Sequence, residues 1–224
     1  VSFKAKKGET IAFIGSTGSG KSTLINLIPR FYDVTSGSIK IDGIDVRDFN
    51  IKTLRSKIGF IRQKTLLFTG SIKSNIKFGK RKASHEEMVH SAKVAQAYDF
   101  INKKEKKFDE PIGEGGSNVS GGQKQRLSIA RALVRKPEIY IFDDSFSALD
   151  FKTDAILRAE LKKETTHAIV LIVAQRIGSI MDADKIIVLD EGNVVGIGKH
   201  KELLKTCSVY KEIALSQLTE EELA

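Results

Sequence analysis

Eight consecutive residues near the start of the chain have the composition of a phosphate-binding loop. Residues 15–22 read Gly-Ser-Thr-Gly-Ser-Gly-Lys-Ser and fit the pattern G-x-x-x-x-G-K-[ST], between an apolar run and a helical run. Glycines let backbone N–H groups converge on phosphate oxygens, and the start of a helix adds partial positive charge. Lys21 supplies a cation for the outer phosphates, and the Ser22 hydroxyl is a ligand for Mg²⁺. The predicted nucleotide contacts are Ser16, Thr17, Gly18, Ser19, Gly20, Lys21, Ser22 and Thr23.

A second candidate group lies much later in the chain. Residues 138–144 form an apolar strand that ends in two carboxylates, Asp143 and Asp144. In proteins with a phosphate loop, an acid at the carboxyl end of a neighbouring strand holds Mg²⁺ or its water. Ligands of open α/β sheets also bind at that edge. The pattern therefore predicts Asp143 as a metal ligand.

A third group, Ser120-Gly121-Gly122-Gln123, opens a helix between the other two. Exposed N–H groups at such a helix start form an anion-binding nest, here without a lysine of its own. The alternative interpretation is an ordinary helix cap made by Ser120. Two anion-binding groups far apart in one chain, 15–22 and 120–123, indicate that two surfaces bind each phosphate tail.

The elements that position these groups follow from hydrophobic periodicity. The chain begins with short strands and continues with helical patterns. Apolar strands then alternate with helices, which predicts a parallel sheet covered on both faces. A hairpin at 191–193 and a terminal helix at 203–218 close the chain, and the helical middle, about 71–133, interrupts the α/β pattern. The expected strands are 2–6, 10–14, 38–41, 58–62, 139–142, 168–173 and 185–189, and the expected helices include 84–102, capped by Ser84, 153–163 and 176–181.

Composition limits the function classes. The 224 residues are 41% hydrophobic, which is enough for a sizeable core, and the longest apolar run, 168–174, is far shorter than a membrane span. A single cysteine, Cys207, excludes an internal disulfide framework. The net charge of +9 points to polyanionic partners such as nucleotides, nucleic acid or anionic membranes. The lysine runs at 80–82 and 103–107 are interpreted as solvated surface.

Residues 119–126, Val-Ser-Gly-Gly-Gln-Lys-Gln-Arg, resemble the signature motif of the ATP-binding cassette (ABC) family, and the resemblance covers nearly the whole chain. Gln63 is similar to the family's Q-loop glutamine, and 147–150 to its D-loop. Residues 67–76 resemble the exporter segment after the Q-loop, and 113–116 lie where exporters carry a coupling segment before the signature. The first of these faces the coupling helices of the membrane domain in exporters.

The resemblance implies one nucleotide-binding domain over 1–224, with the membrane domain absent from this chain. Its expected fold is α/β, a P-loop NTPase core with a mostly parallel sheet, an N-terminal antiparallel β subdomain and an inserted α-helical subdomain at about 71–133. It also implies ATP and Mg²⁺, a second nucleotide-binding domain, and a place at the cytoplasmic face of the cell membrane within a transporter. Each ATP would lie between one chain's phosphate loop and the other chain's Ser120, Gly121, Gly122 and Gln123.

Two departures from the family pattern concern hydrolysis. The family's catalytic carboxylate is normally Glu and its switch residue normally His, but here they are Asp144 and Gln175. An Asp side chain is shorter by about 1.5 Å, and a misplacement of about 1 Å can cost on the order of a hundredfold in rate. The expected hydrolytic residues are Asp144, Gln175 and Gln63, with Mg²⁺ held by Ser22, Gln63 and Asp143. This combination resembles the degenerate-site half of a heterodimeric bacterial multidrug exporter, whose partner is a non-identical half-transporter.

Other classes remain as alternatives. A soluble chromosome-maintenance or repair ATPase shares the signature and acts on nucleic acid, but it inserts a long coiled coil. The about 100 residues between Ser22 and Ser120 show no sustained heptads, so no nucleic-acid partner is expected. A translation-factor ATPase carries two cassettes in tandem, and a small-molecule kinase lacks the signature. The adenine-stacking aromatic residue of the family is expected upstream of Val1.

Overall fold

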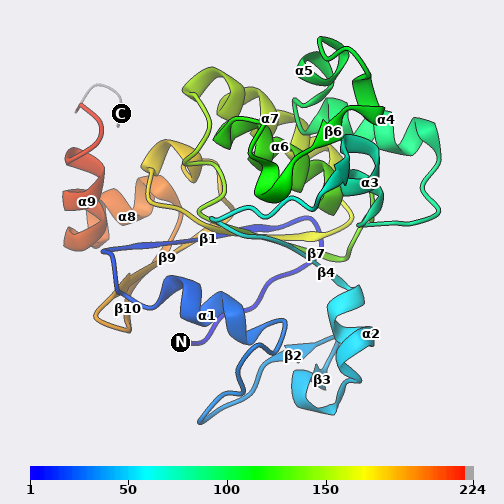
Figure 1. The fold of residues 1–224 in the computed structure, drawn as a ribbon. Helices are drawn as coiled ribbons and strands as arrows, with labels where there is room; N and C mark the ends of the chain where they lie inside the picture. The colour runs from blue at the N-terminus through cyan, green and yellow to red at the C-terminus, as the bar shows by residue number, and fades with distance from the viewer. Residues whose placement is uncertain (220–224) are drawn as a thin grey trace.

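The computed structural model describes residues 1–219 and is built around a six-stranded sheet in the order β10-β9-β1-β8-β7-β4 (Figure 1). Neighbouring strands pair in parallel, except that β10 runs antiparallel to β9. The sheet confirms the predicted α/β class. Its strands are β1 (Thr10–Gly15), β4 (Ile58–Ile61), β7 (Ile139–Asp143), β8 (Ile169–Val173), β9 (Lys185–Asp190) and β10 (Asn193–Gly198).

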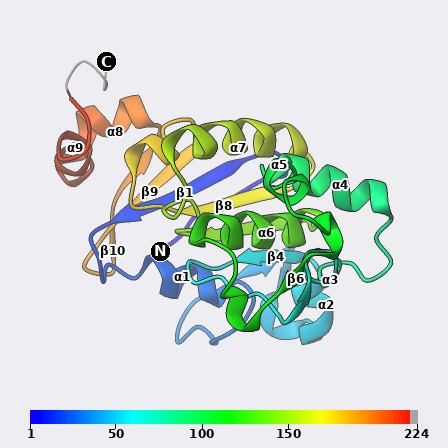
Figure 2. The same cartoon turned by 45° about the horizontal axis from the view of Figure 1, so that its top comes forward.

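The sheet is buried on both faces because successive side chains of a strand point in opposite directions. In β1, Ala12 and Ile14 pack into one core cluster, whereas Ile11 and Phe13 pack into the other. Helices α6 (Gly121–Leu133) and α7 (Phe151–Glu164) cover the first face, and α1 (Lys21–Leu27) and α2 (Ile51–Ser56) lie on the second (Figures 1 and 2). This explains why these strands read as continuous apolar runs.

The helical middle of the chain lies over the face that α6 covers (Figure 2). The Ser84 cap is confirmed, since Ser84 Oγ accepts from Glu87 N at 3.1 Å and Glu87 Oε2 accepts from Ser84 N at 3.0 Å. The predicted continuous helix 84–102 is wrong, because Gln96 takes a left-handed conformation with φ 55° and divides it. The elements here are β5 (Gly70–Ser71), α3 (Ile72–Lys77), α4 (His85–Val94), α5 (Tyr98–Asn102) and β6 (Pro111–Ile112).

The predicted strand 2–6 is also wrong. β1 already has β8 and β9 as neighbours on both sides, so no edge is open beside it. The segment crosses the sheet face instead, with the Phe3 ring packed edge-on against Phe13 at 5.5 Å between centroids. The antiparallel part of this region is the short hairpin β2 (Lys40–Ile41) and β3 (Ile44–Asp45).

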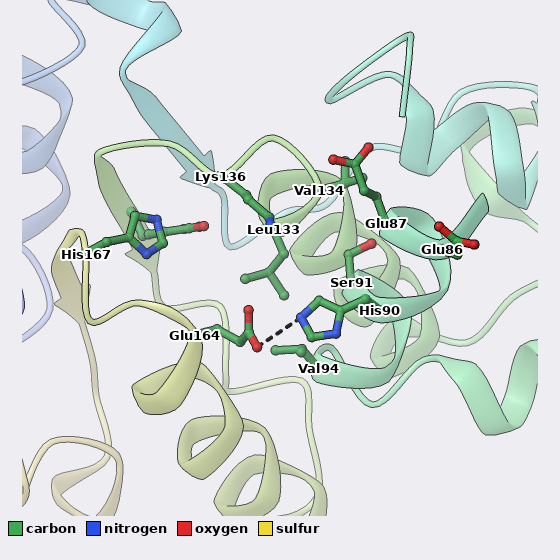
Figure 3. Close-up of a pocket in the computed structure, with 11 residues that line it drawn as sticks. Glu86, Glu87, His90, Ser91, Val94, Leu133, Val134, Lys136, Glu164 and His167 are labelled. Atoms are coloured by element: carbon green, nitrogen blue, oxygen red, sulfur yellow. Dashed lines mark ion pairs between the residues drawn. The ribbon is translucent and has the colours of Figure 1, made fainter. Parts of the chain in front are cut away.

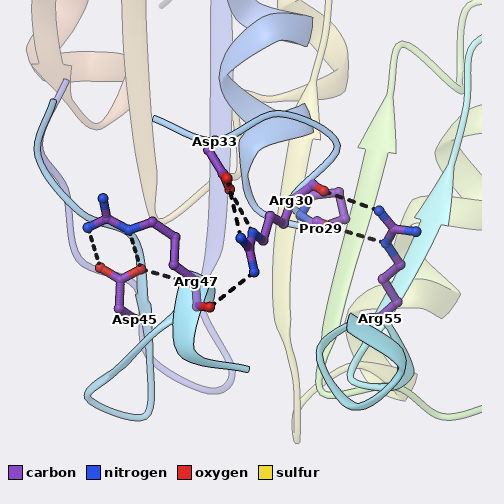
Figure 4. A network of polar contacts seen from close by, with 6 residues as sticks. All are labelled: Pro29, Arg30, Asp33, Asp45, Arg47 and Arg55. Atoms are coloured by element: carbon purple, nitrogen blue, oxygen red, sulfur yellow. Dashed lines mark hydrogen bonds and ion pairs between the residues drawn. The ribbon is translucent and has the colours of Figure 1, made fainter. Parts of the chain in front are cut away.

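Arginine side chains tie this hairpin to the end of α1 (Figure 4). Arg30 pairs with Asp33, with 2.6 Å between Nε and Oδ1, and donates to the Arg47 carbonyl at 3.0 Å. The hydrogen bonds from Arg47 lower the pKa of the Asp45 carboxyl to about 2. Arg55 of α2 donates from Nε to the Pro29 carbonyl at 3.1 Å and from Nη2 to the Arg30 carbonyl. The helix that follows the phosphate loop is therefore fixed at its far end.

The chain after β8 differs from the predicted pattern in two places. The expected helix 176–181 is only a 3₁₀ turn, η4 (Ile177–Ser179). The backbone of Arg176 is extended, and its side chain donates a hydrogen bond to the Ser147 carbonyl. The expected helix 203–218 is two helices, α8 (His200–Thr206) and α9 (Ser208–Leu215), which meet at Cys207 in an extended conformation. Within residues 1–219, no helix combines the length and the apolar character that crossing a membrane requires.

A cavity of about 590 Å³ lies between α4, α6 and α7 (Figure 3). The ion pair between His90 Nε2 and Glu164 Oε1, at 2.9 Å, joins α4 to the end of α7 there. Tyr140 lines it near the beginning of β7, and His167 precedes β8, so it lies at the amino ends of these parallel strands. The phosphate loop follows the carboxyl end of β1. The cavity is thus at the opposite edge of the sheet from the predicted site.

Candidate nucleotide site

The phosphate loop leaves β1 at Gly15 and enters α1 at Lys21. Gly15 has φ 154°, and a Cβ there would lie 1.9 Å from the Leu189 carbonyl oxygen of β9, so a side chain cannot be accommodated. Gly20, the N-cap of α1, has φ 91° and offers no side-chain acceptor. The first N–H groups of α1 therefore have no cap and are available to an anion, as the predicted phosphate cradle requires.

Lys21 lies beneath this loop rather than in solvent. Its Nζ donates to the carbonyls of Gly15 at 2.9 Å and Ser16 at 2.7 Å, and contacts Ser19 Oγ at 3.2 Å. Burial lowers the pKa of Lys21, and the carboxylates of Asp144 and Asp143 oppose that shift. With 8% of its surface exposed, the ammonium group is a nearly desolvated cation at the point where phosphates would enter.

The two predicted metal ligands of the loop and the strand meet. Ser22 Oγ of α1 donates to Asp143 Oδ1 at the end of β7, at 2.8 Å. A hydroxyl and a carboxylate side by side match the hard oxygen ligands that Mg²⁺ takes, usually with few protein ligands and several from phosphate and water. The residues present therefore fit a Mg²⁺ ion bound together with a nucleotide.

Asp144 stands at the centre of the predicted hydrolytic group. Its Oδ2 accepts from Gln63 Nε2 at 2.7 Å and from Gln175 Nε2 at 2.8 Å. Its backbone is left-handed, with φ 47°, and its N–H donates to the Val173 carbonyl at 2.9 Å. The structure thus brings the three residues together, with both amides bonded to one carboxylate oxygen.

The pKa of the Asp144 carboxyl is raised above its ordinary value. Burial is the largest cause, since 8% of the residue is exposed, and the neighbouring Asp143 carboxylate adds to it. The hydrogen bond from Gln63 acts in the opposite direction because it stabilises the ionised form. Asp144 is therefore a desolvated carboxylate restrained by two neutral donors.

The residues 120–123 form a separate group at the start of α6. Ser120 Oγ accepts from Gln123 N at 3.3 Å, and Gln123 Oε1 accepts from Ser120 N at 3.1 Å. Ser120 therefore caps the helix, which was the alternative interpretation, and Gly121 and Gly122 form its first turn. In residues 1–219, no hydrogen bond joins this group to the phosphate loop. The group 120–123 and the phosphate loop are thus two separate groups in this chain.

The family model described as "ABC transporter" matches residues 1–147, which include the phosphate loop, the signature and the paired aspartates. The chain belongs to the ABC transporter family. Its fold and its motifs make it an ATP-binding and ATP-hydrolysing domain of that family.

Curated relatives and solved structures place this ABC domain beside exporters. It is 46% identical over 213 residues to a protein of Staphylococcus aureus strain NCTC 8325 that is named, provisionally, a multidrug export ATP-binding/permease protein. The same identity holds for the corresponding protein of strain Mu50. The match covers 95% of this chain but 37% of those relatives. A bacterial Atm1-family ABC exporter with ATP bound superposes with a TM-score of 0.95 at 38% identity, over 98% of this chain and 39% of that one.

Two side chains that the motifs did not single out brace the site of the ABC domain. Gln125, buried in α6, accepts from the Thr65 hydroxyl and donates to the Arg62 carbonyl at 3.4 Å, so it bonds both sides of the Q-loop. Arg176 donates to the Ser147 carbonyl at 3.2 Å and stacks over Phe151 at 5.1 Å. Each lies within or next to a recognised motif, which was the available signal, but the contacts join segments distant in sequence.

Proposed function

We propose that this ABC domain drives export across a membrane by closing on ATP against a second nucleotide-binding domain. The observation that carries the proposal is the separation of the two predicted anion-binding groups, 15–22 and 120–123, which have no hydrogen bond between them in residues 1–219. A phosphate tail held by both needs two chains in head-to-tail arrangement. The names of the exporter relatives support a membrane transporter, and we place this domain at the cytoplasmic face of that membrane.

We further propose how the residues divide the work within the bound nucleotide. Lys21 and the N–H groups of 16–23 bind the phosphates, while Ser22 and Asp143 hold Mg²⁺ with Gln63. The Mg²⁺ ion supplies neutralisation of charge that develops on the phosphoryl oxygens. Ser120, Gly121, Gly122 and Gln123 act on the partner's ATP. These assignments rest on the short contacts at the carboxyl ends of β1 and β7.

The proposed weakness of this chain's own hydrolytic site rests on Asp144 and Gln175. The Asp144 side chain is shorter than that of a glutamate. The side-chain amides of Gln63 and Gln175 also hold its carboxylate in place by hydrogen bonds. Gln175 can donate a hydrogen bond to a phosphate but cannot carry a proton. We therefore propose a pair of non-identical chains in which this chain's signature completes the more active site.

An aromatic patch supports the proposed contact with the coupling helices of a membrane domain. Phe68 and Phe78 are 47% and 61% exposed, with their ring centroids 4.6 Å apart, and Leu66 beside them is 69% exposed. Arg131 of α6 lies over both rings and donates to the Leu66 carbonyl at 3.0 Å. Its burial lowers the pKa of Arg131 to about 10, which leaves it charged at neutral pH.

The elements between the two motifs argue against the nucleic-acid alternative. The longest helix between Ser22 and Ser120 is α4, with ten residues. A coiled coil needs several heptads, so this stretch has no room for one.

Isothermal titration calorimetry of the protein with MgATP tests the nucleotide site. Lys21→Ala should remove most of the affinity, at least tenfold, because the phosphates lose the cation buried beneath the loop. Lys52→Ala, an exposed lysine of α2, is the matched control and should bind as the parent does. Unchanged affinity in Lys21→Ala would overturn the assignment of 15–22 as the phosphate cradle.

A further inference from the structure

The segment 175–177, which carries Gln175 and is called here the switch loop, is held from the carboxyl-terminal end of the chain. Gln217 Nε2 donates to the Gln175 carbonyl at 2.7 Å, and Gln217 Oε1 accepts from the Ile177 N–H at 2.8 Å. Both ends of one side-chain amide are therefore bonded to the backbone of the loop. The two bonds fix the distance between the loop and the residue that follows α9.

Gln217 is exposed, but the helix that precedes it is packed on the core. Its N–H donates to the Ala214 carbonyl at 3.1 Å, at the end of α9. Ala214 and Tyr210 on the same helix are fully buried, and Leu218 packs against their cluster. The Tyr210 hydroxyl contacts His200 Nδ1 at 2.7 Å, which joins α9 to α8. The pair α8–α9 lies at one end of the sheet (Figure 2). Gln217 therefore contacts the switch loop from the end of a helix that is packed on the core.

The other side of the switch loop is fixed by Arg176. Its guanidinium group bonds to the carbonyls of Ser147 at 3.2 Å and Leu149 at 3.5 Å and stacks on Phe151. Between these two supports, Gln175 Nε2 donates to Asp144 Oδ2. The carbonyl that Gln217 holds belongs to the same residue whose side chain holds Asp144. A shift of that peptide plane moves the amide relative to the carboxylate.

We infer that Gln217 is a positioning residue for hydrolysis, which sets the place of the Gln175 amide over Asp144 and makes α9 part of the nucleotide site. The inference rests on the proposed role of Asp144 and Gln175. When the Gln217 amide is removed, the Gln175 carbonyl and the Ile177 N–H turn to water. The loop is then held from one side only, while the phosphate loop keeps all its contacts. Turnover at this chain's own site should therefore fall without a loss of nucleotide affinity.

Amide hydrogen exchange and steady-state kinetics on the self-paired chain, in which both nucleotide sites are this chain's own, test the inference. In Gln217→Ala, the peptide that contains Ile177 should exchange at least tenfold faster, with kcat reduced about three- to tenfold and KM for MgATP within twofold. The matched control is Lys211→Ala on the same helix, an exposed residue, which should match the parent in every measurement. Parent-like exchange in Gln217→Ala, or an equal loss in the control, would overturn the positioning role.

A second variant separates the two hydrogen bonds. Gln217→Glu keeps an oxygen that accepts from the Ile177 N–H but loses the donor to the Gln175 carbonyl. We expect slow exchange at Ile177 together with the same fall in kcat as in Gln217→Ala. A kcat equal to the parent's would show that the donor does not position Gln175. If the parent fails to bind MgATP, the proposed function fails, whereas the exchange experiment still decides whether Gln217 holds the loop.

Discussion

The phosphate loop and the carboxylate end of β7 lie side by side, yet they are assembled in different ways. The hydrogen bonds that hold Lys21 span two to six positions of the chain. Those that hold Asp144 come from Gln63 and Gln175, 81 and 31 positions away. The first is a local structure that a single motif encodes. The second forms only when β4, β7 and β8 are aligned in the sheet.

This difference separates two kinds of chemistry. The phosphate loop has every residue type that binding an anion requires, and its geometry is fixed by its own backbone. The hydrolytic group depends on side-chain amides that reach a carboxylate from other segments, and two of its residues depart from the family pattern. Changes in the first region should therefore act on affinity, and changes in the second on turnover at this chain's own site.

The largest effect is expected at Ser120, in the surface that we propose acts on the partner's ATP. In the assembled transporter, Ser120→Glu should nearly abolish ATP turnover because it places negative charge against the phosphates of the more active site. Asp144→Asn should cost little, because its own site contributes little hydrolysis. Donors to a transferring phosphoryl group are worth a few kcal/mol. Phosphate release should differ between the two variants at least tenfold, or about 1.4 kcal/mol.

A helix-cap control is available for that comparison. Ser84 caps α4 with the same reciprocal pair of hydrogen bonds as Ser120 in α6. Ser84→Glu should therefore leave turnover close to that of the parent. Equal losses in Ser120→Glu and Asp144→Asn would mean two equivalent sites, and the proposal of non-identical chains would be abandoned.

A smaller effect is expected when the hydrolytic group alone is changed. A self-paired chain contains two copies of the weak site, so it should hydrolyse ATP slowly. Asp144→Glu combined with Gln175→His should raise the rate of phosphate release by roughly tenfold or more, because the base then reaches about 1.5 Å further. The two single variants are the controls. A parent that already turns over briskly, or a double variant without gain, would contradict the degenerate site.

The smallest effect concerns stability and pH. Because burial raises the pKa of Asp144 in the folded state, ionisation disfavours folding. Below the unfolded pKa of about 3.9 the carboxyl is neutral in both states, and folding stability is then highest with respect to this group. That stability is lost as pH rises through the folded pKa, because the buried carboxyl must then ionise. Asp144→Asn, whose side-chain oxygen can still accept from Gln63 and Gln175, should therefore melt at a higher temperature than the parent at pH 7.5. Calorimetry should show the difference shrinking toward pH 4, and the opposite trend would contradict the raised pKa.

The sequence predicted the parts of the fold that depend on local pattern. The buried strands after 138 and the Ser84 cap follow from periodicity and capping chemistry, and the structure has them. The strand at 2–6 failed because pairing needs an open neighbour, which periodicity does not reveal. The helix 84–102 failed at Gln96, whose left-handed backbone ends the first helix in a turn closed by the hydrogen bond from the Ala97 N–H to the Ala92 carbonyl, and no glycine or asparagine marks that turn in the sequence.

The candidate site shows the same limit. The identities of Lys21, Ser22 and Asp143 follow from motifs and their order along parallel strands. The two amides on one oxygen of Asp144 could not be predicted, because side-chain direction depends on the packing of three segments. Gln217 has no motif at all, and only the position of α9 brings it to the switch loop.

Helix α6 is capped by Ser120 and carries Arg131 near its other end, over the aromatic rings of Phe68 and Phe78. Eleven residues of α-helix span about 16 Å along an axis that bends little. The guanidinium group also bonds to Asn75 and to the Leu66 carbonyl, so this end cannot slide independently of its surroundings. Because a helix of this length bends little, we expect a displacement of the aromatic patch to move Ser120 as well, and a displacement of Ser120 to move the patch.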